Sequence, residues 1–377
     1  MKLIYIANLR LPTEKAYGIQ IAKMCEAFAL KGANLTLIWP YRKNKVEEDF
    51  FDYYSIKRNY KIKVFWAPDI YFTDKYELLN IIIMIIKNFF SALTLAFYAL
   101  FKKSDIIFSR DELIVLFLSV FKKKIIYEPH RFSKRRKFFY WIFKIRKVKI
   151  AAITYRFKDD FMKIGFKPED VLVAPDGVNI NEFAIDISKE TAREKTNLPL
   201  DKKIVMYAGH LFEWKGANVL AKAAELINDA LFVFVGGTER DVHNFRVQYG
   251  DKENIKIVGF KLHNEIPVYL KAADVLILPN SAKEEISRHY TSPLKMFEYM
   301  ASQRPIVASD LPSLREVLNG ANAVLVEPDD PEKLAAGIRK ILNDSNLGNR
   351  ISDKAFSDVQ DYTWEKRAEE ILNFTKR

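Results

Sequence analysis

The sequence predicts an α/β protein with two Rossmann-like, doubly wound domains, and three observations support this fold class. At 377 residues the chain is longer than one ordinary hydrophobic core requires. Short apolar runs typical of buried strands alternate with helical stretches. This alternation occurs in two consecutive sets, one in each half of the chain, so each half is expected to form its own parallel sheet.

The first half opens with a strand–helix–strand unit. Residues 2–7 and 34–39 read as strands around a helical stretch from 19 to 31, and Gly32 is expected to end that helix. Further strands are predicted at 62–66, 105–108, 124–127, 149–153 and 171–174.

The second half repeats the pattern, and the linker is predicted near 180–200, around Pro199. The predicted domains are 1–185, joined by a C-terminal helix at 362–377, and 190–361. Strands are expected at 203–208, 231–235, 255–258, 274–278, 306–308 and 323–326, and helices near 216–228, 265–272, 293–302, 312–318, 331–343 and 363–376.

The charge is distributed unevenly along the chain. The net charge is +12, and residues 1–190 contribute 34 basic against 21 acidic residues, whereas 191–377 contribute 26 against 27. The first half is therefore expected to meet an anionic partner. The single cysteine, Cys25, excludes a disulfide framework and a Cys-rich metal site, and it favours a reducing compartment. No secretory signal is recognised, because residues 2–7 read as a first strand.

Two segments of the first half bear on membranes. Residues 78–101 are nearly all apolar and long enough to span a bilayer, but Lys87 near their centre would be costly there. A buried helix or a membrane-surface helix is expected instead. Residues 122–149 mix cations with large aromatics, a pattern typical of binding to an anionic membrane surface. A core helix with a solvated basic face and a nucleic-acid binder are the alternatives.

The segment 290–310 reads as loop, helix, turn and strand. Thr291, Ser292 and Pro293 are helix start signals, and Leu294 and Phe297 recur at helical spacing with 300–301. A helix N-terminus suits a phosphate, and a carboxylate one turn further on, Glu298, suits the hydroxyls of a ribose. Taken alone, the segment favours an ordinary α/β unit over a nucleotide site.

A second segment, 207–216, follows a predicted strand and opens a helix. Gly209 allows a tight turn, and Lys215 would project above the strand ends, where ligands of open α/β sheets bind. Together with SPLKMFEYMA at 292–301, this segment resembles the family 4 nucleotide-sugar glycosyltransferases of the GT-B fold, also called glycosyl transferases group 1. The resemblance covers nearly the whole chain and is strong over 203–317. It implies two domains facing across a cleft, and retaining, metal-independent hexosyl transfer.

The resemblance implies a donor site in the second half. Glu298 would accept both ribose hydroxyls, and Lys215, Lys295 and the amides of 292–295 would stabilise the diphosphate leaving group. The catalytic residues are predicted to be His130, Lys215 and Glu298. The donor-binding residues are predicted to be Gly18, Gly209, His210, Lys215, Gly236, Val258, Gly259, Phe260, Tyr290, Thr291, Ser292, Pro293, Leu294, Lys295 and Glu298.

In the first half, the resemblance puts Gly18 in the first strand-to-helix loop, facing the diphosphate, and His130 near the donor sugar. Glu128, Arg110 and Arg131 are predicted to contact the acceptor. Two departures from the family pattern concern the donor. Tyr290 stands where the family usually has a glutamate that reads the sugar, and His210 stands where it usually has an arginine.

The predicted function is transfer of a sugar, with retention, from a UDP- or GDP-sugar to a glycan or lipid-linked acceptor in cell-surface polysaccharide or glycoconjugate assembly. The protein is expected in the cytoplasm, peripheral on the inner face of the membrane, bound through 122–149. No cofactor, metal or nucleic acid is expected. The adjacent carboxylates Asp329 and Asp330 are candidates for a metal motif, but they read as a turn and helix cap. The alternatives are a nucleotide-sugar epimerase of the same architecture and a non-catalytic basic protein that binds nucleic acid or membrane.

Overall fold

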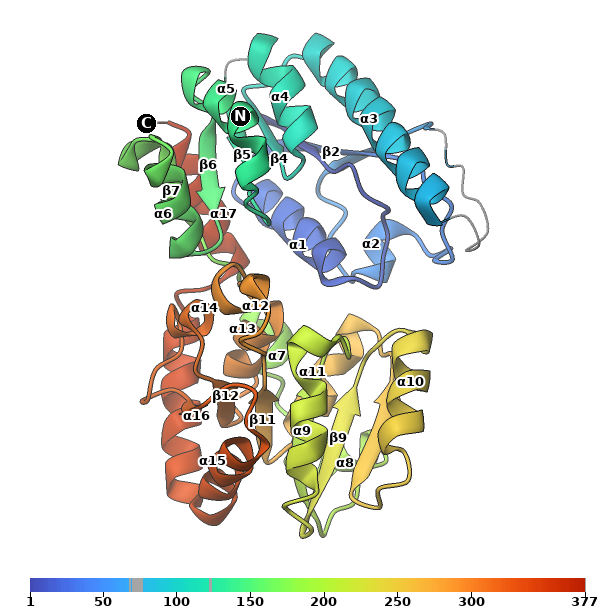
Figure 1. Cartoon of the computed structure of the whole chain (residues 1–377), viewed down its shortest axis with the longest axis vertical. Helices are drawn as coiled ribbons and strands as arrows, with labels where there is room; N and C mark the ends of the chain where they lie inside the picture. Colours follow the sequence, from blue (N-terminus) through green and yellow to red (C-terminus); the bar gives the residue numbers. More distant parts are fainter. Residues whose placement is uncertain (68, 70–76, 122–123, 377) are drawn as a thin grey trace. The chain divides into compact units, whose positions relative to one another are not determined.

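The computed structural model describes residues 1–67, 69, 77–121 and 124–376. They form two compact units (Figure 1), namely Met1–Pro175 with Trp364–Arg377, and Asp176–Thr363. The chain thus passes between the units ten residues earlier than the predicted boundary at 185. Residues 122 and 123, the first two of the predicted membrane-binding segment, lie outside the described part of the chain.

The first unit contains a seven-stranded sheet in the order β3-β2-β1-β4-β5-β6-β7, and all of its described pairs are parallel. Parallel strands are covered on both faces, which explains their apolar sequences. The strands are β1 Lys2–Ile6, β2 Asn34–Pro40, β3 Lys61–Phe65, β4 Ile106–Ser109, β5 Ile125–Tyr127, β6 Lys149–Ala152 and β7 Val171–Val173.

Helices cover both faces of this sheet (Figure 1). On one face α1 packs against α17, the C-terminal helix, and on the other α3 packs against α4 and α4 against α5. The helices are α1 Ala16–Leu30, α2 Phe50–Tyr53, α3 Glu77–Phe101, α4 Glu112–Phe121, α5 Lys137–Ile145, α6 Tyr155–Lys163 and α17 Trp364–Phe374, with short 3-10 turns at Lys134–Arg136 and Pro168–Asp170.

The second unit contains a six-stranded parallel sheet in the order β10-β9-β8-β11-β12-β13. Alternate residues of β8 enter two cores, one on each face: Ile204 and Met206 on one side, Val205 and Tyr207 on the other. The strands are β8 Lys203–Ala208, β9 Ala230–Val235, β10 Ile255–Gly259, β11 Val275–Leu278, β12 Ile306–Ser309 and β13 Val324–Val326.

Helices on both faces close these two cores. Residues of α13 and α11 fill one core, and those of α9 and α10 fill the other. The helices are α7 Ile180–Phe183, α8 Lys189–Lys195, α9 Ala217–Ala224, α10 Glu239–Tyr249, α11 Ile266–Ala272, α12 Glu285–His289, α13 Leu294–Ala301, α14 Pro312–Arg315, α15 Pro331–Asn343 and α16 Ser345–Val359, with 3-10 turns at Glu213–Lys215 and His263–Glu265.

One element of the first unit is not the buried core helix that its composition allowed. Helix α3 is the one helix of the described chain whose length and composition would suffice to cross a membrane, over Leu79–Phe101, yet only 22% of its most apolar window is buried.

Asp330 caps a helix, as the sequence predicts. Its carboxylate accepts from the N–H groups of Glu332 and Lys333 at the start of α15.

Candidate functional site

Three glycines lie side by side where β8, β9 and β10 end in the second unit. The Gly209 N–H donates to Val235 O (2.8 Å), and the Gly236 N–H donates to Gly259 O (2.7 Å). All three glycines have positive φ, and a Cβ on Gly236 would lie 2.6 Å from Gly209 O. This edge of the sheet is therefore bare backbone, which a ligand can approach closely.

A fourth glycine fixes the loop that carries Lys215. Gly216 has φ +76°, and a Cβ there would lie 1.6 Å from the Pro279 carbonyl oxygen. Only glycine can approach this carbonyl so closely. The backbone one residue after Lys215 therefore packs directly against Pro279, which follows β11. The Lys215 ammonium lies 5.3 Å from the Trp214 ring centroid, and burial lowers the pKa of Lys215 to about 8 although the Glu298 carboxylate opposes that shift.

His210, the residue after the first glycine, stacks its ring on Phe212. The ring centroids are 4.9 Å apart and the planes are 5° from parallel. Its backbone carbonyl accepts from the Tyr207 hydroxyl at 2.6 Å. The loop between β8 and Lys215 is thus held by aromatic contacts as well as by Gly216.

Helix α13 places a buried lysine beside the glycine edge. Lys295 is 8% exposed, and among the described residues its Nζ has no hydrogen-bond partner. The ammonium lies 4.2 Å from the Tyr207 ring centroid, and the side chain passes 3.8 Å from where a Cβ of Gly209 would stand. Burial, and then the charge of Lys215, hold the pKa of Lys295 well below its usual range.

Glu298 lies one turn after Lys295 and is held by a residue that the sequence did not predict. His263 Nε2 lies 2.9 Å from Glu298 Oε1, and the carboxylate is nearly buried. The two residues are 35 positions apart. Without a strand or helix motif at 263–265, the sequence carried no signal that would bring this histidine to the glutamate.

The start of α13 differs from the prediction. Pro293 occupies the N-cap position and no side chain caps the helix. The Ser292 hydroxyl instead accepts from the Asp176 N–H at 3.0 Å, so it holds the chain where the second unit begins. Thr291 and Leu294 are only partly buried, whereas Phe297 is fully buried as expected.

The predicted donor-binding residues Val258, Gly259 and Phe260 lie at and beside the glycine edge. The register of β10 shifts between Ile257 and Gly259, which is typical of a bulge, and Phe260 is 47% exposed. A cavity of about 250 Å³ opens here, lined by Gly237, Glu239, Val242, His243, Arg246, Gly259 and Phe260. Val258, by contrast, packs against the core. Tyr290 follows α12 directly, and its ring contacts that of His289 (6.3 Å).

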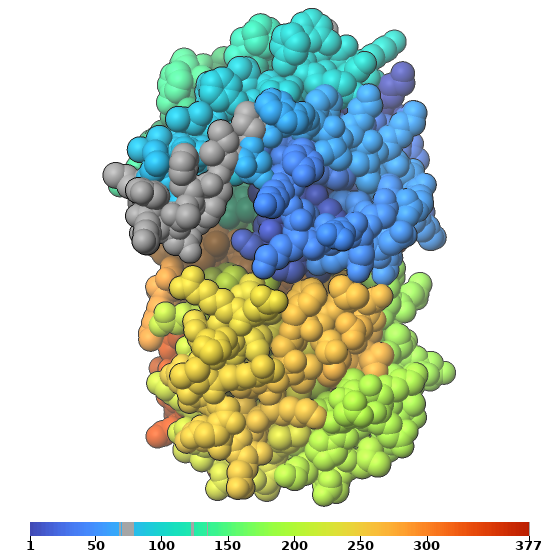
Figure 2. All heavy atoms as spheres, turned by 90° about the vertical axis from the view of Figure 1, so that its right-hand side faces the viewer, coloured from blue at the N-terminus to red at the C-terminus, as the bar shows by residue number. Residues whose placement is uncertain are grey.

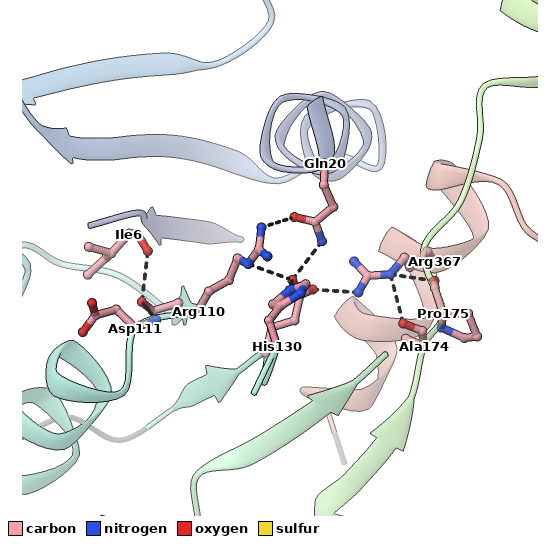
Figure 3. Close-up of polar contacts among 10 residues, drawn as sticks. Ile6, Gln20, Arg110, Asp111, His130, Ala174, Pro175 and Arg367 are labelled. Atoms are coloured by element: carbon pink, nitrogen blue, oxygen red, sulfur yellow. Dashed lines mark hydrogen bonds and ion pairs between the residues drawn. The ribbon is translucent and has the colours of Figure 1, made fainter. Parts of the chain in front are cut away.

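In the first unit, the predicted residues His130 and Arg110 lie close to Gln20 and Arg367 (Figure 3), and the predicted Glu128 lies among them. Its fully buried carboxylate accepts from Arg367 Nη2 (2.6 Å) and Gln20 Nε2 (2.8 Å), and His130 Nε2 lies 2.7 Å away. Arg110 donates to the Gln20 amide oxygen at 2.9 Å. Although burial raises the pKa of Glu128, Arg367 and His130 hold it far below its ordinary value.

This environment decides the charge of His130. Burial, followed by the charge of Arg110, lowers the pKa of His130 to about 4, so the imidazole is neutral at neutral pH. Because Nε2 faces a carboxylate, it carries the proton. The Nδ1 atom of a neutral His130 can accept a hydrogen bond from a sugar hydroxyl, but the ring supplies no positive charge.

The two remaining predicted residues of the first unit are Gly18, which the structure places differently from the prediction, and Arg131. Gly18 does not lie in a loop, because α1 begins at Ala16. A Cβ on Gly18 would lie 2.0 Å from the Tyr54 hydroxyl oxygen, so close packing inside the unit explains this glycine. Arg131 is exposed, and no contact described here brings it to Glu128.

The comparisons with known proteins are consistent with this geometry. Residues 188–358 match the family described as glycosyl transferases group 1. An uncharacterized glycosyltransferase of Methanocaldococcus jannaschii is 27% identical over 238 residues, which cover 60% of this chain and 59% of that protein. The aligned part of the chain thus spans less than two thirds of this relative's length.

Solved structures match along the entire chain. Sucrose-phosphate synthase from Thermosynechococcus elongatus has a TM-score of 0.75 at 18% identity, covering 100% of this chain and 98% of its own. Anabaena HepE, solved in complex with UDP and glucose, has a TM-score of 0.74 at 16% identity, covering 100% and 99%. At such identities these likenesses show the fold, two Rossmann-like units of the GT-B type.

Proposed function

We propose that this chain, whose residues 188–358 match the glycosyl transferases group 1, transfers a sugar, with retention, from a UDP- or GDP-sugar to a glycan or lipid-linked acceptor. The observation that carries the proposal is the pairing of two desolvated lysines, Lys215 and Lys295, with the bare glycine edge. The solved structure of HepE with UDP and glucose supports a uridine donor.

The chemistry of the leaving group explains why such a pairing is suitable. A nucleoside diphosphate gains negative charge as the glycosidic bond breaks, and aimed cations and N–H groups stabilise that charge. Lys215 and Lys295 supply the cations, so no metal ion is required in this proposal. Glu298, held by His263, accepts the ribose hydroxyls. Neutral His130 would bind a hydroxyl of the donor sugar.

We further propose that the basic first unit takes the acceptor at an anionic membrane surface on the cytoplasmic side, in cell-surface glycan assembly. Helix α5 supports this, because Phe138 and Trp141 are exposed beside Lys137 and Lys144. Aromatic rings at the headgroup level and lysines that meet anionic lipid are the two components of such binding.

Nucleotide binding followed by turnover tests the transferase proposal. UDP or GDP is expected to raise the melting temperature, more than ADP or TDP, because a ligand of the native state stabilises it by mass action. Incubation of UDP- and GDP-sugars with membrane lipid extract is then expected to give a glycosylated product. Glu298→Gln should lose turnover and the matched exposed variant Glu253→Gln should keep it. Release of an epimerised nucleotide sugar, or salt-dependent nucleic-acid binding without any turnover, would overturn the proposal.

The pKa of Lys215 predicts how nucleotide affinity depends on pH. Below pH 8 the Lys215 ammonium is already charged, so Lys215 adds no pH dependence to the affinity for UDP there. Above pH 8 a proton must be taken up on binding, and affinity should fall by about tenfold per pH unit. Calorimetry in two buffers of different ionisation enthalpy measures that proton. Lys215→Arg should bind one proton fewer at pH 9, and an unchanged native affinity up to pH 9.5 contradicts the assignment.

His263 is expected to act as a positioning residue for Glu298. His263→Ala removes one hydrogen bond to the carboxylate, worth about 1 kcal/mol, so the Kd for UDP should rise several-fold to tenfold. The loss should be much smaller for 2′-deoxy-UDP, which lacks one of the hydroxyls assigned to Glu298. His263→Gln, whose amide can still donate, should restore part of the affinity. Equal losses for both nucleotides would point to a purely structural role.

A further inference from the structure

Helix α3 carries a continuous stripe of large apolar side chains that the first unit does not cover. Residues four apart, such as Ile85 (60% exposed), Phe89, Leu93 and Phe97 (63% exposed), follow one another along the helix. Figure 2 shows side chains of this segment (light blue to cyan) at the surface. The exposed large residues are Leu79, Ile81, Ile82, Met84, Ile85, Ile86, Phe89, Phe90, Leu93, Phe97 and Phe101.

The opposite side of α3 packs against the rest of the unit through buried apolar residues and polar contacts. Ala92, Leu95 and Ala99 are fully buried. The Ser91 hydroxyl accepts from Arg42 at 2.7 Å, and Lys87 forms an ion pair with Asp69 (2.7 Å) in which both side chains are 18% exposed. These contacts would have to break if the helix crossed a bilayer, so α3 lies along the unit with one face open.

We propose that α3 is an in-plane membrane helix, whose apolar stripe enters the boundary between headgroups and acyl chains of an anionic bilayer. The inference rests on the membrane association proposed above. It adds α3 as a second membrane-binding element, outside 122–149, and assigns to α3 the apolar contribution to membrane affinity. An amphipathic helix of this kind binds through buried apolar area together with attraction to anionic lipid.

The neighbouring helices identify lipid as the occupant. Helices α3, α4 and α5 pack in that order on one face of the sheet. The sequence has no acidic residue from 79 to 101 or in α5, and Glu112 of α4 is buried beside Arg136. The layer thus combines an apolar stripe with the exposed cations of α5, which complements a surface of acyl chains under anionic headgroups.

A second copy of the chain fits this face less well. In a two-fold dimer the same patch meets itself, so the cations of one α5 would face the layer that carries the cations of the other. Apolar burial would then be opposed by like-charge repulsion, whereas anionic lipid satisfies both components at once.

A cysteine scan with vesicles tests the proposal. The chain's one cysteine, Cys25, is buried, so Ile85→Cys or Phe97→Cys can be labelled selectively with an environment-sensitive dye. On vesicles of phosphatidylcholine with phosphatidylglycerol, the emission should shift to the blue, and lipids brominated in their acyl chains should quench it. The same label at Val247, an exposed residue of α10, should do neither.

Flotation of the unlabelled protein separates the two components of binding. Ile85→Ser with Phe97→Ser should weaken binding by at least about tenfold at both low salt and 0.5 M salt. Lys137→Glu with Lys144→Glu should weaken it mainly at low salt. The matched control Val247→Ser should float as the native chain does.

Three outcomes would overturn the inference. The first is a dye at position 85 or 97 whose emission shows no blue shift and no quenching when vesicles are added. The second is an Ile85→Ser, Phe97→Ser variant that floats with vesicles as well as the native protein does. The third is a doubled mass in light scattering with a blue shift before vesicles are added, which would assign the face to a second copy. UDP binding should be unaltered in the α3 variants, so failure here is distinguishable from failure of the transferase proposal.

Discussion

Replacing Lys295 by methionine is expected to stabilise the free protein and to slow sugar transfer by about a hundredfold or more. The two effects have opposite signs for one reason. In the described chain the Lys295 ammonium is buried without a hydrogen-bond partner and lies near a second cation, Lys215. A buried charge of this kind costs folding free energy, which the nearby Glu298 carboxylate offsets only in part, while a bound diphosphate would supply a full counter-charge.

The expected gain in stability of Lys295→Met is modest, because a cation–π contact with the Tyr207 ring already offsets part of the cost of burying the ammonium. Methionine fills the same space without a charge, so the free energy of unfolding should rise by about 1 kcal/mol. Thermal unfolding without nucleotide measures this gain. The addition of UDP should then stabilise the variant far less than the native protein.

Lys271 provides a matched control. It is also a buried lysine of the second unit, but its ammonium donates to the Gln303 side chain at 3.1 Å. Lys271→Met should therefore cost stability or leave it unchanged, and kcat/KM should stay native. If Lys295→Met retained native kcat/KM, Lys295 would have no part in charge stabilisation.

The strands could be predicted closely because both faces of each sheet are covered. Buried parallel strands read as continuous apolar runs, and the run 203–208 coincides with β8. Helices α10 and α16 were not predicted. Each has many polar residues and only a narrow buried face, for example Val242, Phe245 and Tyr249 in α10, so the helical periodicity is weak.

The residues of the candidate site were predictable only where they follow a motif. Lys215, Lys295 and Glu298 lie next to strand and helix signals, and the structure brings them together. Gln20, His263 and Arg367 were missed because their partners are distant in the chain, and side-chain packing alone selects them. The prediction that placed Gly18 in a loop was wrong, because α1 begins at Ala16, and a glycine required by packing looks the same in sequence as one required by a turn.

Breaking the Glu128–Arg367 pair is expected to produce the largest loss of stability, about 3–5 kcal/mol. The Glu128 carboxylate is fully buried and Arg367 is 4% exposed. Arg367 also donates to the carbonyls of Ala174 (3.1 Å) and Pro175 (2.8 Å). It therefore links α17 to the last residues of the segment 1–175. Arg367→Met leaves a buried carboxylate without its main counter-charge.

A double-mutant cycle distinguishes this pair from ordinary packing. Glu128→Gln and Arg367→Met should each be strongly destabilising, and the double variant should cost clearly less than the sum, because the second change removes the charge that the first left unpaired. The control is the exposed pair between Lys31, at the end of α1, and Glu369, which lies on α17 as Arg367 does. Glu369→Gln should leave the free energy of unfolding nearly unchanged, because water screens an exposed ion pair.

The pair should also give the protein a defined response to acid. The pKa of Glu128 is lower in the folded state than the usual value near 4.5, so the unfolded chain binds the proton first as pH falls. Stability from this group is therefore complete above pH 4.5 and declines below it. Glu128→Gln, although less stable at pH 7, should lose less stability between pH 5 and pH 3 than the native protein does. Denaturant midpoints measured across that range provide the test, and parallel acid curves for the two proteins would show that the carboxylate is not held charged by Arg367.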